Sequence, residues 1–365
     1  MEKKLDKFHF PLFSVLLVLV GIGLVNLYSA LDMWGETAMS HLFWSQLVSV
    51  GIGSLFFLVF AFLDYRIWER LTWGFFGTGL FLLILVLLIG DVRGGHRSWL
   101  GMGGFSFQPT ELVKFAMIVV FAKYFADRPL PDGYGWRELF LPALLMWVPF
   151  LLVIAQKDLG GSLFFPLIFV TMAWLARIKK RTIISGLVLA GLLGFLSYQY
   201  GLKDYQKDRL KNFFDPSHDV RGSGYHLLQS KIAVGSGQFL GRGYLKGKIN
   251  KLRYLPAKHT DFIFPVLAEE WGFLGCSVVL GLYLTLLVMG IQIGTRARER
   301  FGAFLSFGVV ALLFWQVVIN LGGVLGIMPL TGVTLPLLSY GGSSMVTLLG
   351  AMGLLLNIHM RRFLF

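Results

Sequence analysis

The residue of this chain best suited to chemistry is Asp261, a carboxylate directly before a long apolar run. It lies in the segment Leu255 to Phe264, which reads LPAKHTDFIF. Because Pro256 fixes a turn and an apolar helix follows, Thr260 or Asp261 could be the helix N-cap, a role worth about 1 kcal/mol. The carboxylate could instead act as a general base, if burial raises its pKa, or as a metal ligand beside His259. The residues alone leave these roles open.

A second charged group lies between Arg93 and Lys114. Arg97 opens the run RSWLG, and Pro109 suits the first turn of a helix that then carries Glu111 and Lys114. Since Glu111 and Lys114 are three residues apart, they can pair on one helix face. Alternatively, Arg97 and Lys114 could bind the oxygens of a pyrophosphate. The spacing does not decide between a self-neutralising pair and an anion site.

A polar break interrupts the apolar C-terminal third. From Met328 to Ser344 the chain reads MPLTGVTLPLLSYGGSS, with two prolines and three glycines. This pattern predicts either a broken, re-entrant segment buried against protein or a tight outer loop. Glu269 and Glu270, two turns into the preceding apolar run, are expected to point into the protein because a carboxylate facing lipid is costly.

The composition places these groups in a membrane protein. The 365 residues are 56% hydrophobic and 15% charged, whereas a soluble domain has about 25% charged residues. A spanning helix needs about 20 mostly apolar residues. We therefore predict an all-α integral membrane protein, a single polytopic domain of residues 1–365 with ten transmembrane helices, near 11–30, 42–63, 72–90, 109–126, 139–155, 161–176, 182–200, 263–293, 302–326 and 343–360. The short fifth and sixth runs could also form one bent hairpin.

Lysine and arginine in the short loops predict the orientation. They gather before the first run and after the second, sixth, eighth and tenth, so both termini are expected to be cytoplasmic. The large loop 201–261, between spans seven and eight, is then extracytoplasmic. It is nevertheless basic, with twelve Lys or Arg against five Asp, a net charge of +7. Either anionic lipid headgroups or a phosphorylated ligand at this loop would account for that charge.

Several function classes are not supported. The net charge of +13 suggests an anionic partner, but there is no aromatic-basic RNA-binding motif, so we expect membrane lipids and no nucleic acid. The single cysteine, Cys276, excludes an intramolecular disulfide framework. The order of residues matches neither a Ser-His-Asp hydrolase, nor a zinc site, nor a phosphate-binding Walker loop.

Taken in order, these motifs resemble the SEDS family (shape, elongation, division and sporulation: RodA, FtsW and SpoVE), and its RodA branch most. The resemblance covers nearly the whole chain. It departs from the family pattern at Lys157–Gly161, KDLGG where the family usually has PDLGT, which leaves the role of Asp158 open. The matching segments are 97–101, 105–114, 224–225, 229–230, 235–237, 255–262 with 269–270, 329–332, 335–336 and 339–344.

The resemblance implies a peptidoglycan glycosyltransferase of the bacterial inner membrane that polymerises lipid II, a disaccharide-peptide on undecaprenyl pyrophosphate, during elongation. Asp261 would be the catalytic base, with no certain cofactor, although a divalent cation (Mg²⁺ or Mn²⁺) stays open. A class B penicillin-binding protein would be the partner. The alternatives are a lipid II flippase and a non-catalytic scaffold for a transpeptidase. The residues expected to bind the substrate are Arg97, Glu111, Lys114, Lys258, His259, Thr260 and Ser343.

Overall fold

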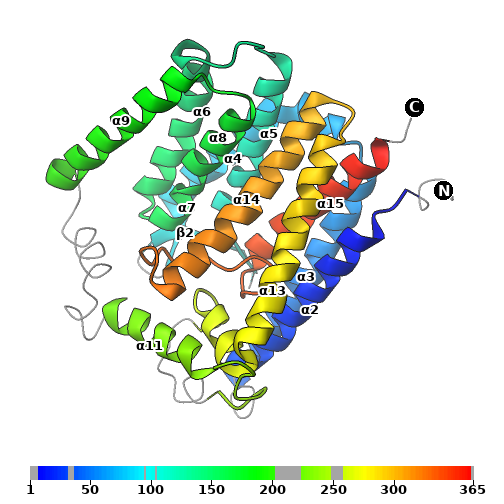
Figure 1. Cartoon of the computed structure of the whole chain (residues 1–365), viewed down its shortest axis with the longest axis vertical. Helices are drawn as coiled ribbons and strands as arrows, with labels where there is room; N and C mark the ends of the chain where they lie inside the picture. The colour runs from blue at the N-terminus through cyan, green and yellow to red at the C-terminus, as the bar shows by residue number, and fades with distance from the viewer. Residues whose placement is uncertain are drawn as a thin grey trace.

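The computed structural model describes residues 7–31, 37–93, 96–102, 105–201, 223–247 and 258–362. Figure 1 shows a bundle of helices in which both termini lie at one end and α11 lies at the other. The helices are α2 (Phe10–Leu31), α3 (Thr37–Phe62), α4 (Arg66–Ile89), α5 (Pro109–Asp127), α6 (Trp136–Ala155), α7 (Leu159–Ser162), α8 (Phe164–Leu175), α9 (Lys180–Leu196), the π-helix η1 (Ser197–Gly201), α11 (Ser223–Ser236), α13 (Ile263–Thr295), α14 (Arg300–Leu325) and α15 (Gly342–Arg361).

Within the described ranges, eight helices are long and apolar enough to cross a membrane: α2, α3, α4, α6, α9 with η1, α13, α14 and α15. Helices also occupy the other two predicted runs. One of them is α5, which carries charged residues such as Glu111 and Lys114. The other is the α7–α8 pair, a shorter apolar helix that is broken after Ser162.

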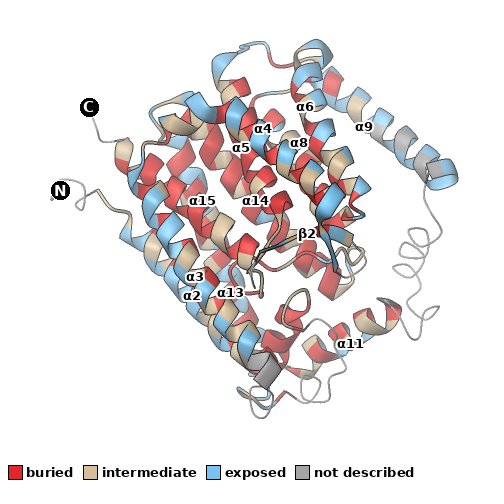
Figure 2. Cartoon of the chain, turned by 180° about the vertical axis from the view of Figure 1, so that it is seen from behind, coloured by how far each residue is buried: buried red, intermediate tan, exposed pale blue. Residues whose placement is uncertain are grey.

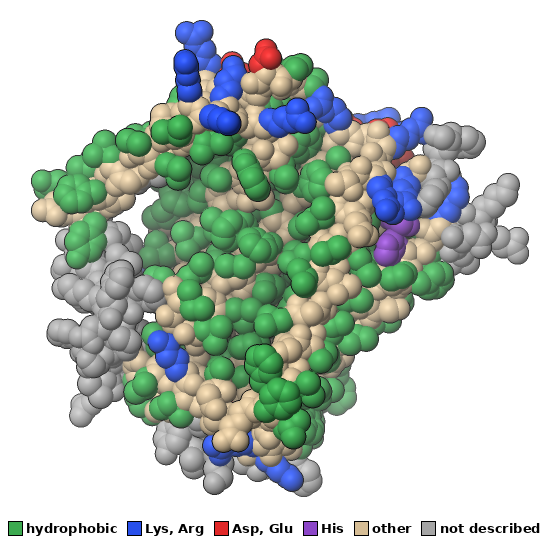
Figure 3. All heavy atoms as spheres, viewed as in Figure 1, with side chains coloured by type: hydrophobic (Ala, Val, Ile, Leu, Met, Phe, Trp, Pro, Cys, Tyr) green, Lys and Arg blue, Asp and Glu red, His purple; other side chains and the backbone are tan. Residues whose placement is uncertain are grey.

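The helix α5 forms the centre of the bundle. It packs against α4, α8, α14 and α15, and its residues from Val113 to Ala122 are all buried. Figure 2 shows the buried residues gathered in this interior, while α9 stands apart with most of its surface exposed. On the outside, hydrophobic side chains cover the middle of the molecule and Lys and Arg gather toward its two ends (Figure 3). This distribution fits a protein surrounded by lipid.

A short β-sheet that the sequence analysis did not predict lies between α4 and α5. The strands β1 (Asp91–Arg93), β2 (His96–Met102) and β3 (Phe105–Phe107) pair antiparallel in the order β1-β2-β3. Strands this short carry little alternation of polar and apolar residues, so the run RSWLG did not indicate a strand. The predicted all-α fold is therefore confirmed in its coarser form: the chain is mostly helical and also contains this short sheet.

The helix α13 is interrupted at Gly272, whose φ is +65°. The loop 238–243 fills the gap. A Cβ at Gly272 would lie 2.2 Å from the amide nitrogen of Gly241, so only glycine fits there. The loop satisfies the backbone groups that the break leaves without helical partners. The four backbone hydrogen bonds run from Phe273 N to Gln238 O (2.8 Å), Leu274 N to Phe239 O (3.1 Å), Arg242 N to Glu269 O (2.9 Å) and Gly243 N to Glu270 O (3.0 Å).

The two carboxylates before the kink are buried, as predicted. Glu269 and Glu270 do point inward, being 1% and 2% exposed, and Ser29 Oγ donates to Glu270 Oε1 at 2.5 Å. Of the basic loop 201–261, residues 202–222 and 248–257 lie outside the described residues, and the part between them contains α11.

Candidate active site

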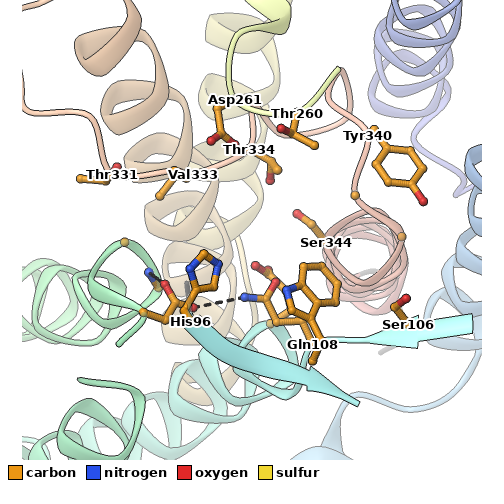
Figure 4. Close-up of a pocket in the computed structure, with 18 of the residues that line it drawn as sticks. His96, Ser106, Gln108, Thr260, Asp261, Thr331, Val333, Thr334, Tyr340 and Ser344 are labelled. Carbon is orange, nitrogen blue, oxygen red and sulfur yellow. Dashed lines mark hydrogen bonds between the residues drawn. The ribbon is translucent and has the colours of Figure 1, made fainter. Parts of the chain in front are cut away.

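A cavity of about 810 Å³ opens at the α11 end of the bundle. Figure 4 shows Asp261 and Thr260 on one side of it, with His96 and Gln108 on the strand side opposite. The third side is formed by α3 and the start of α15. The cavity is lined by His41, Leu42, Ser45, Ser49, His96, Trp99, Ser106, Gln108, Glu111, Lys114, Lys157, Asp158, Leu159, Gly160, Gly161, Phe164, Leu227, His259, Thr260, Asp261, Pro329, Leu330, Thr331, Gly332, Val333, Thr334, Tyr340, Gly341, Gly342 and Ser344.

The turn that carries Asp261 is fixed through its backbone. It is held by α14 and by the segment 326–341, which is non-helical and packed against the protein. The segment is buried against the protein at Val333 and from Leu335 to Ser339, which agrees with the prediction of a broken segment packed against protein. Its re-entry into the membrane stays a prediction. The hydrogen bonds run from Asn320 Nδ2 to Asp261 O (2.9 Å) and Val333 O (2.7 Å), from Ser339 Oγ to Thr260 O (2.6 Å), and from Tyr340 N to His259 O (2.8 Å).

Neither Asp261 nor Thr260 caps α13, contrary to one of the sequence interpretations. Phe262 is the N-cap residue and makes no side-chain cap. The side chain of Asp261 faces the cavity instead, where its Oδ2 lies 3.6 Å from the place that a Cβ on Gly332 would occupy. Because Gly332 has a φ of +73° and no side chain, the re-entrant segment passes close to the carboxylate without covering it.

The electrostatic setting of Asp261 suits a base. Burial raises the pKa of its carboxyl to about 6, although a hydrogen bond from the side chain of Thr260 and the charge of His96 both lower it. Burial, with a smaller contribution from the charge of Lys258, lowers the pKa of His259. A carboxylate with a pKa near neutrality is ionised at pH 7 and still takes up a proton more readily than an ordinary aspartate.

The charged residues of α5 form the pair that their spacing allows. Lys114 Nζ donates to Glu111 Oε1 at 2.7 Å, and both side chains are almost completely buried. The ammonium also lies 4.3 Å from the centre of the Phe164 ring. The pair thus brings little net charge to the cavity that it lines.

The predicted site residues fall into three groups. Asp261, His259, Thr260, Glu111 and Lys114 line the cavity together. Ser343 lies directly behind the lining, where its Oγ accepts from Gln108 N at 2.9 Å and donates to Ser106 O at 3.4 Å.

Arg97 and Lys258 do not line the cavity. The guanidinium of Arg97 turns back to donate to Leu87 O at 3.2 Å, and its side chain is exposed. Lys258 is 5% exposed and is not among the residues that line the cavity. Sequence spacing placed both residues near the site, but it carries no information on the direction of a long side chain.

Several lining residues were not selected from the sequence. Asp158, whose role the sequence left open, accepts from Gly161 N at 2.8 Å and from Gln108 Nε2 at 3.2 Å, so it ties the start of α7 to α5. His96 and Trp99 enter the cavity from β2. The run RSWLG indicated this side of the cavity. Arg97 was predicted to bind the substrate, whereas its neighbours His96 and Trp99 are the residues that line the cavity.

Metal binding depends on the ligands that the cavity offers. The described part of the chain contains no group of three or more His, Cys, Asp or Glu side chains that could hold a metal ion. Magnesium, however, is often bound by one or two carboxylates together with substrate phosphates. Asp261 is placed to be such a carboxylate, so the cavity is compatible with a cation that arrives with a phosphorylated substrate.

Comparison with known proteins gives the family. A family model of the FtsW/RodA/SpoVE type, described as cell cycle protein, matches residues 10–363. Stage V sporulation protein E of Bacillus subtilis is 37% identical over 353 residues, with 94% of each chain covered. The peptidoglycan glycosyltransferase MrdB of Escherichia coli is 34% identical over 358 residues, covering 98% of this chain and 95% of that protein.

Solved structures agree with these relatives. A chain from a peptidoglycan synthase complex that coordinates polymerization and crosslinking has a TM-score of 0.83 and 32% identity, with 98% of both chains covered. The rod shape determining protein RodA of Thermus thermophilus has a TM-score of 0.71 and 31% identity, again over 98% of both chains. With its long apolar helices and this match along almost its entire length, the chain is a multi-pass membrane protein that belongs to the FtsW/RodA/SpoVE family.

Proposed function

We propose that this chain is a peptidoglycan glycosyltransferase that polymerises lipid II into glycan strands, with Asp261 as general base. The observation that carries the proposal is a partly buried carboxylate, with a pKa raised to about 6, in a polar cavity of about 810 Å³. Relatives that match along nearly their whole length are themselves named peptidoglycan glycosyltransferases.

In the proposed reaction, a hydroxyl of the acceptor sugar attacks the anomeric carbon of the donor sugar. The new carbon–oxygen bond forms on the face opposite the leaving group, so the configuration inverts. The bond from the anomeric carbon to the pyrophosphate oxygen breaks, and the lipid pyrophosphate leaves with the electron pair. Asp261 takes the proton of the attacking hydroxyl.

The remaining lining residues orient the reactants. His259 and Thr260 flank the base on the same turn and offer hydrogen-bonding groups to a sugar. The Glu111–Lys114 pair presents fixed dipoles from α5 without a large net charge. A divalent cation, where one binds, would be held by Asp261 and the phosphate oxygens of the substrate and would offset their charge.

The proposal extends to topology. Ten spans would comprise the eight long apolar helices, the buried α5 and the broken α7–α8 pair, with both termini in the cytoplasm and the basic loop outside. The adjacent termini and the position of α11 at the opposite end support this arrangement (Figure 1). We assign the chain to elongation because a structural relative is a rod shape determining protein.

We also propose a class B penicillin-binding protein as partner. The structural relative with a TM-score of 0.83 is part of a complex that coordinates polymerization with crosslinking. A polymerase of this kind would hand its glycan strand to the transpeptidase beside it.

A flippase would need polar groups along the whole membrane depth. Here Leu227 of α11 lines the cavity, and along α5 the last lining residue is Lys114. Beyond it, α5 continues with the buried apolar run from Phe115 to Ala122. The polar lining therefore favours polymerisation over transport.

The test is polymerisation of purified lipid II by the purified chain, alone and with the penicillin-binding protein. Glycan strands are separated by gel electrophoresis. Strands that the chain makes alone, or that lengthen when the partner is added, support the proposal. If the chain alone makes no strands and the complex with Asp261→Asn makes as many as the wild-type complex, the partner makes them and the chain is a scaffold.

A further inference from the structure

The leaving pyrophosphate needs a positive counterpart in the cavity, and the predicted cations do not supply it. Lys114 is bound by Glu111, while Arg97 and Lys258 do not line the cavity. Lys157 lines it but is exposed, so it is poorly fixed. Proteins also bind phosphates at helix N-termini, where backbone amides supply positive potential.

The helix that starts at the cavity is α15. Its N-cap residue Gly341, its first residue Gly342 and Ser344 all line the cavity. The first amide that bonds back to the turn is that of Met345, which donates to Gly341 O at 2.8 Å. The amides of residues 342–344 have no acceptor within the described ranges. The partial positive charge of this 20-residue helix is thus presented to the cavity.

Ser344 is a second, independent indication of a ligand. Its side chain belongs to a residue that is only 8% exposed, it lines the cavity, and its hydroxyl has no hydrogen-bond partner among the residues that the structure describes. Figure 4 shows the hydroxyl pointing away from the helix into the cavity. The hydroxyl is accessible from the cavity, so a ligand or water there can supply its hydrogen bond.

The neighbouring Ser343 is a useful contrast. Its hydroxyl is occupied on both sides, because it accepts from Gln108 N and donates to Ser106 O. Ser343 therefore holds α15 against the segment 106–108, whereas the hydroxyl of Ser344 is available to a ligand. Gly341 and Gly342 carry no side chain that could keep an anion from the backbone amides.

Hydrogen bonds connect the residues just before α15 to the turn that carries Asp261. Tyr340 N donates to His259 O at 2.8 Å, and Ser339 Oγ donates to Thr260 O at 2.6 Å. These two residues come directly before the α15 N-terminus and clamp the turn that carries Asp261. An anion held at α15 would consequently lie at the same end of the cavity as the base.

We propose that the N-terminus of α15, together with the Ser344 hydroxyl, is the oxyanion subsite that binds phosphate oxygens of a lipid-linked pyrophosphate. The identity of this ligand rests on the proposed function. The carboxylates that share the cavity do not fill the subsite: Glu111 is paired with Lys114, and Asp158 is bonded to Gly161 N and Gln108. Asp261 belongs to the opposite step of the reaction, the removal of the acceptor proton.

The test is equilibrium binding to the full-length chain in detergent, without turnover. The probes are undecaprenyl pyrophosphate, undecaprenol, which lacks the anion, and inorganic pyrophosphate as competitor. Ser344→Asp adds a negative charge where an acidic residue favours the helix and repels a phosphate. We expect it to weaken undecaprenyl pyrophosphate binding by about tenfold or more, while undecaprenol binding and the melting temperature do not fall. Ser344→Ala should weaken binding by a smaller factor.

Ser54→Ala is the matched control, since Ser54 is exposed on α3 and its loss should leave every probe unaffected. Competition by inorganic pyrophosphate in the wild type, and its loss in Ser344→Asp, would show that the subsite recognises the phosphate rather than the lipid tail. Undecaprenyl pyrophosphate binding by Ser344→Asp within twofold of the wild type would overturn the proposal.

The experiment also separates this subsite from the proposed function. Measured in the Asp261→Asn background, the dependence on Ser344 stands even if the wild type fails to polymerise lipid II. Conversely, normal polymerisation by Ser344→Asp would reject the subsite and leave the glycosyltransferase proposal intact.

Discussion

At the scale of single residues, Asp261 is under opposed influences. Burial raises the pKa of its carboxyl, whereas the hydrogen bond from Thr260 and the charge of His96 lower it. The balance leaves a pKa of about 6, which keeps the group ionised at pH 7. A base must be ionised to accept a proton, so the rate should follow this ionisation.

The pH profile is the first prediction. The rate of lipid II polymerisation under kcat/KM conditions should rise as pH passes through about 6 and level off above it. His96→Ala removes an influence that lowers the pKa of Asp261, so its midpoint should move to higher pH. Initial rates across the acid range measure both. A midpoint that is unchanged in His96→Ala would remove His96 from the account.

The buried pair on α5 gives a second prediction. Glu111→Gln or Lys114→Met alone leaves one buried charge without its partner and should destabilise the fold, by up to about 3–5 kcal/mol in a dry interior. The double variant should recover much of this loss. Thermal unfolding in detergent measures the cycle, with Lys123→Met as the control because the Lys123–Asp127 pair is more exposed. Additive losses in the double variant would contradict the pairing.

At this scale the sequence predicted contacts that helix geometry fixes, but not the direction of long side chains. The i, i+3 spacing was sufficient to predict the Glu111–Lys114 pair because a regular helix fixes that geometry. Arg97 failed since its long side chain turns back to Leu87 O. Ser344 could not be distinguished from Ser343 by sequence, because the difference lies in which hydroxyl meets the strand wall.

At the scale of elements, the site depends on how the Asp261 turn is joined to α14 and to the re-entrant segment. Asn320 is the joint, since its amide donates to the carbonyls of both Asp261 and Val333. It is 4% exposed and does not line the cavity. Asn320 is thus a positioning residue that acts through Asp261.

A third prediction follows from this joint. Asn320→Asp replaces the donor by an acceptor that repels both carbonyls. It should lower kcat by roughly 10- to 100-fold, the equivalent of about 1–3 kcal/mol, with KM nearly unchanged. Gln316→Ala, one turn earlier on α14, is the control because no hydrogen bond joins it to the Asp261 turn among the described residues. Full kcat in Asn320→Ala would show that the joint is not needed.

Most elements could be predicted from the apolar runs, because lipid demands long helices. The β1–β3 sheet was missed, since its strands are short and glycines separate them in the sequence. The N-cap of α13 was misplaced by one residue because Asp261 has the right residue type for a cap, yet its side chain serves the cavity. The kink at Gly272 was not predicted, because it depends on a loop that is distant in sequence.

At the scale of the whole molecule, orientation can be tested directly. We expect Lys180→Cys, at the start of α9, to face the cytoplasm and Lys246→Cys, in the loop after α11, to face outward. Both positions are exposed, and Cys276 is buried and can be replaced by Ser to remove the background. In intact cells an impermeant maleimide should label only the second variant. Labelling of the first alone would invert the proposed topology.

Function at this scale was accessible from the sequence because ordered motifs run along the whole chain and match the family model over residues 10–363. The position of α9 was not, since an apolar run predicts a span but not its neighbours. In the structure α9 exposes apolar side chains such as Leu187 and Phe195. What covers this helix in the membrane depends on lipid and partners outside the chain.

The central claim is that Asp261 removes the proton of the attacking hydroxyl. The most direct measurement is polymerisation of purified lipid II by Asp261→Asn beside the wild type, with undecaprenyl pyrophosphate binding measured in both. The amide is nearly isosteric and cannot be ionised. The account predicts loss of polymerisation by about 100-fold or more, retained binding, and a melting temperature above pH 6 that is no lower than that of the wild type, because burial disfavours the ionised carboxylate. Polymerisation at the wild-type rate by Asp261→Asn would contradict it.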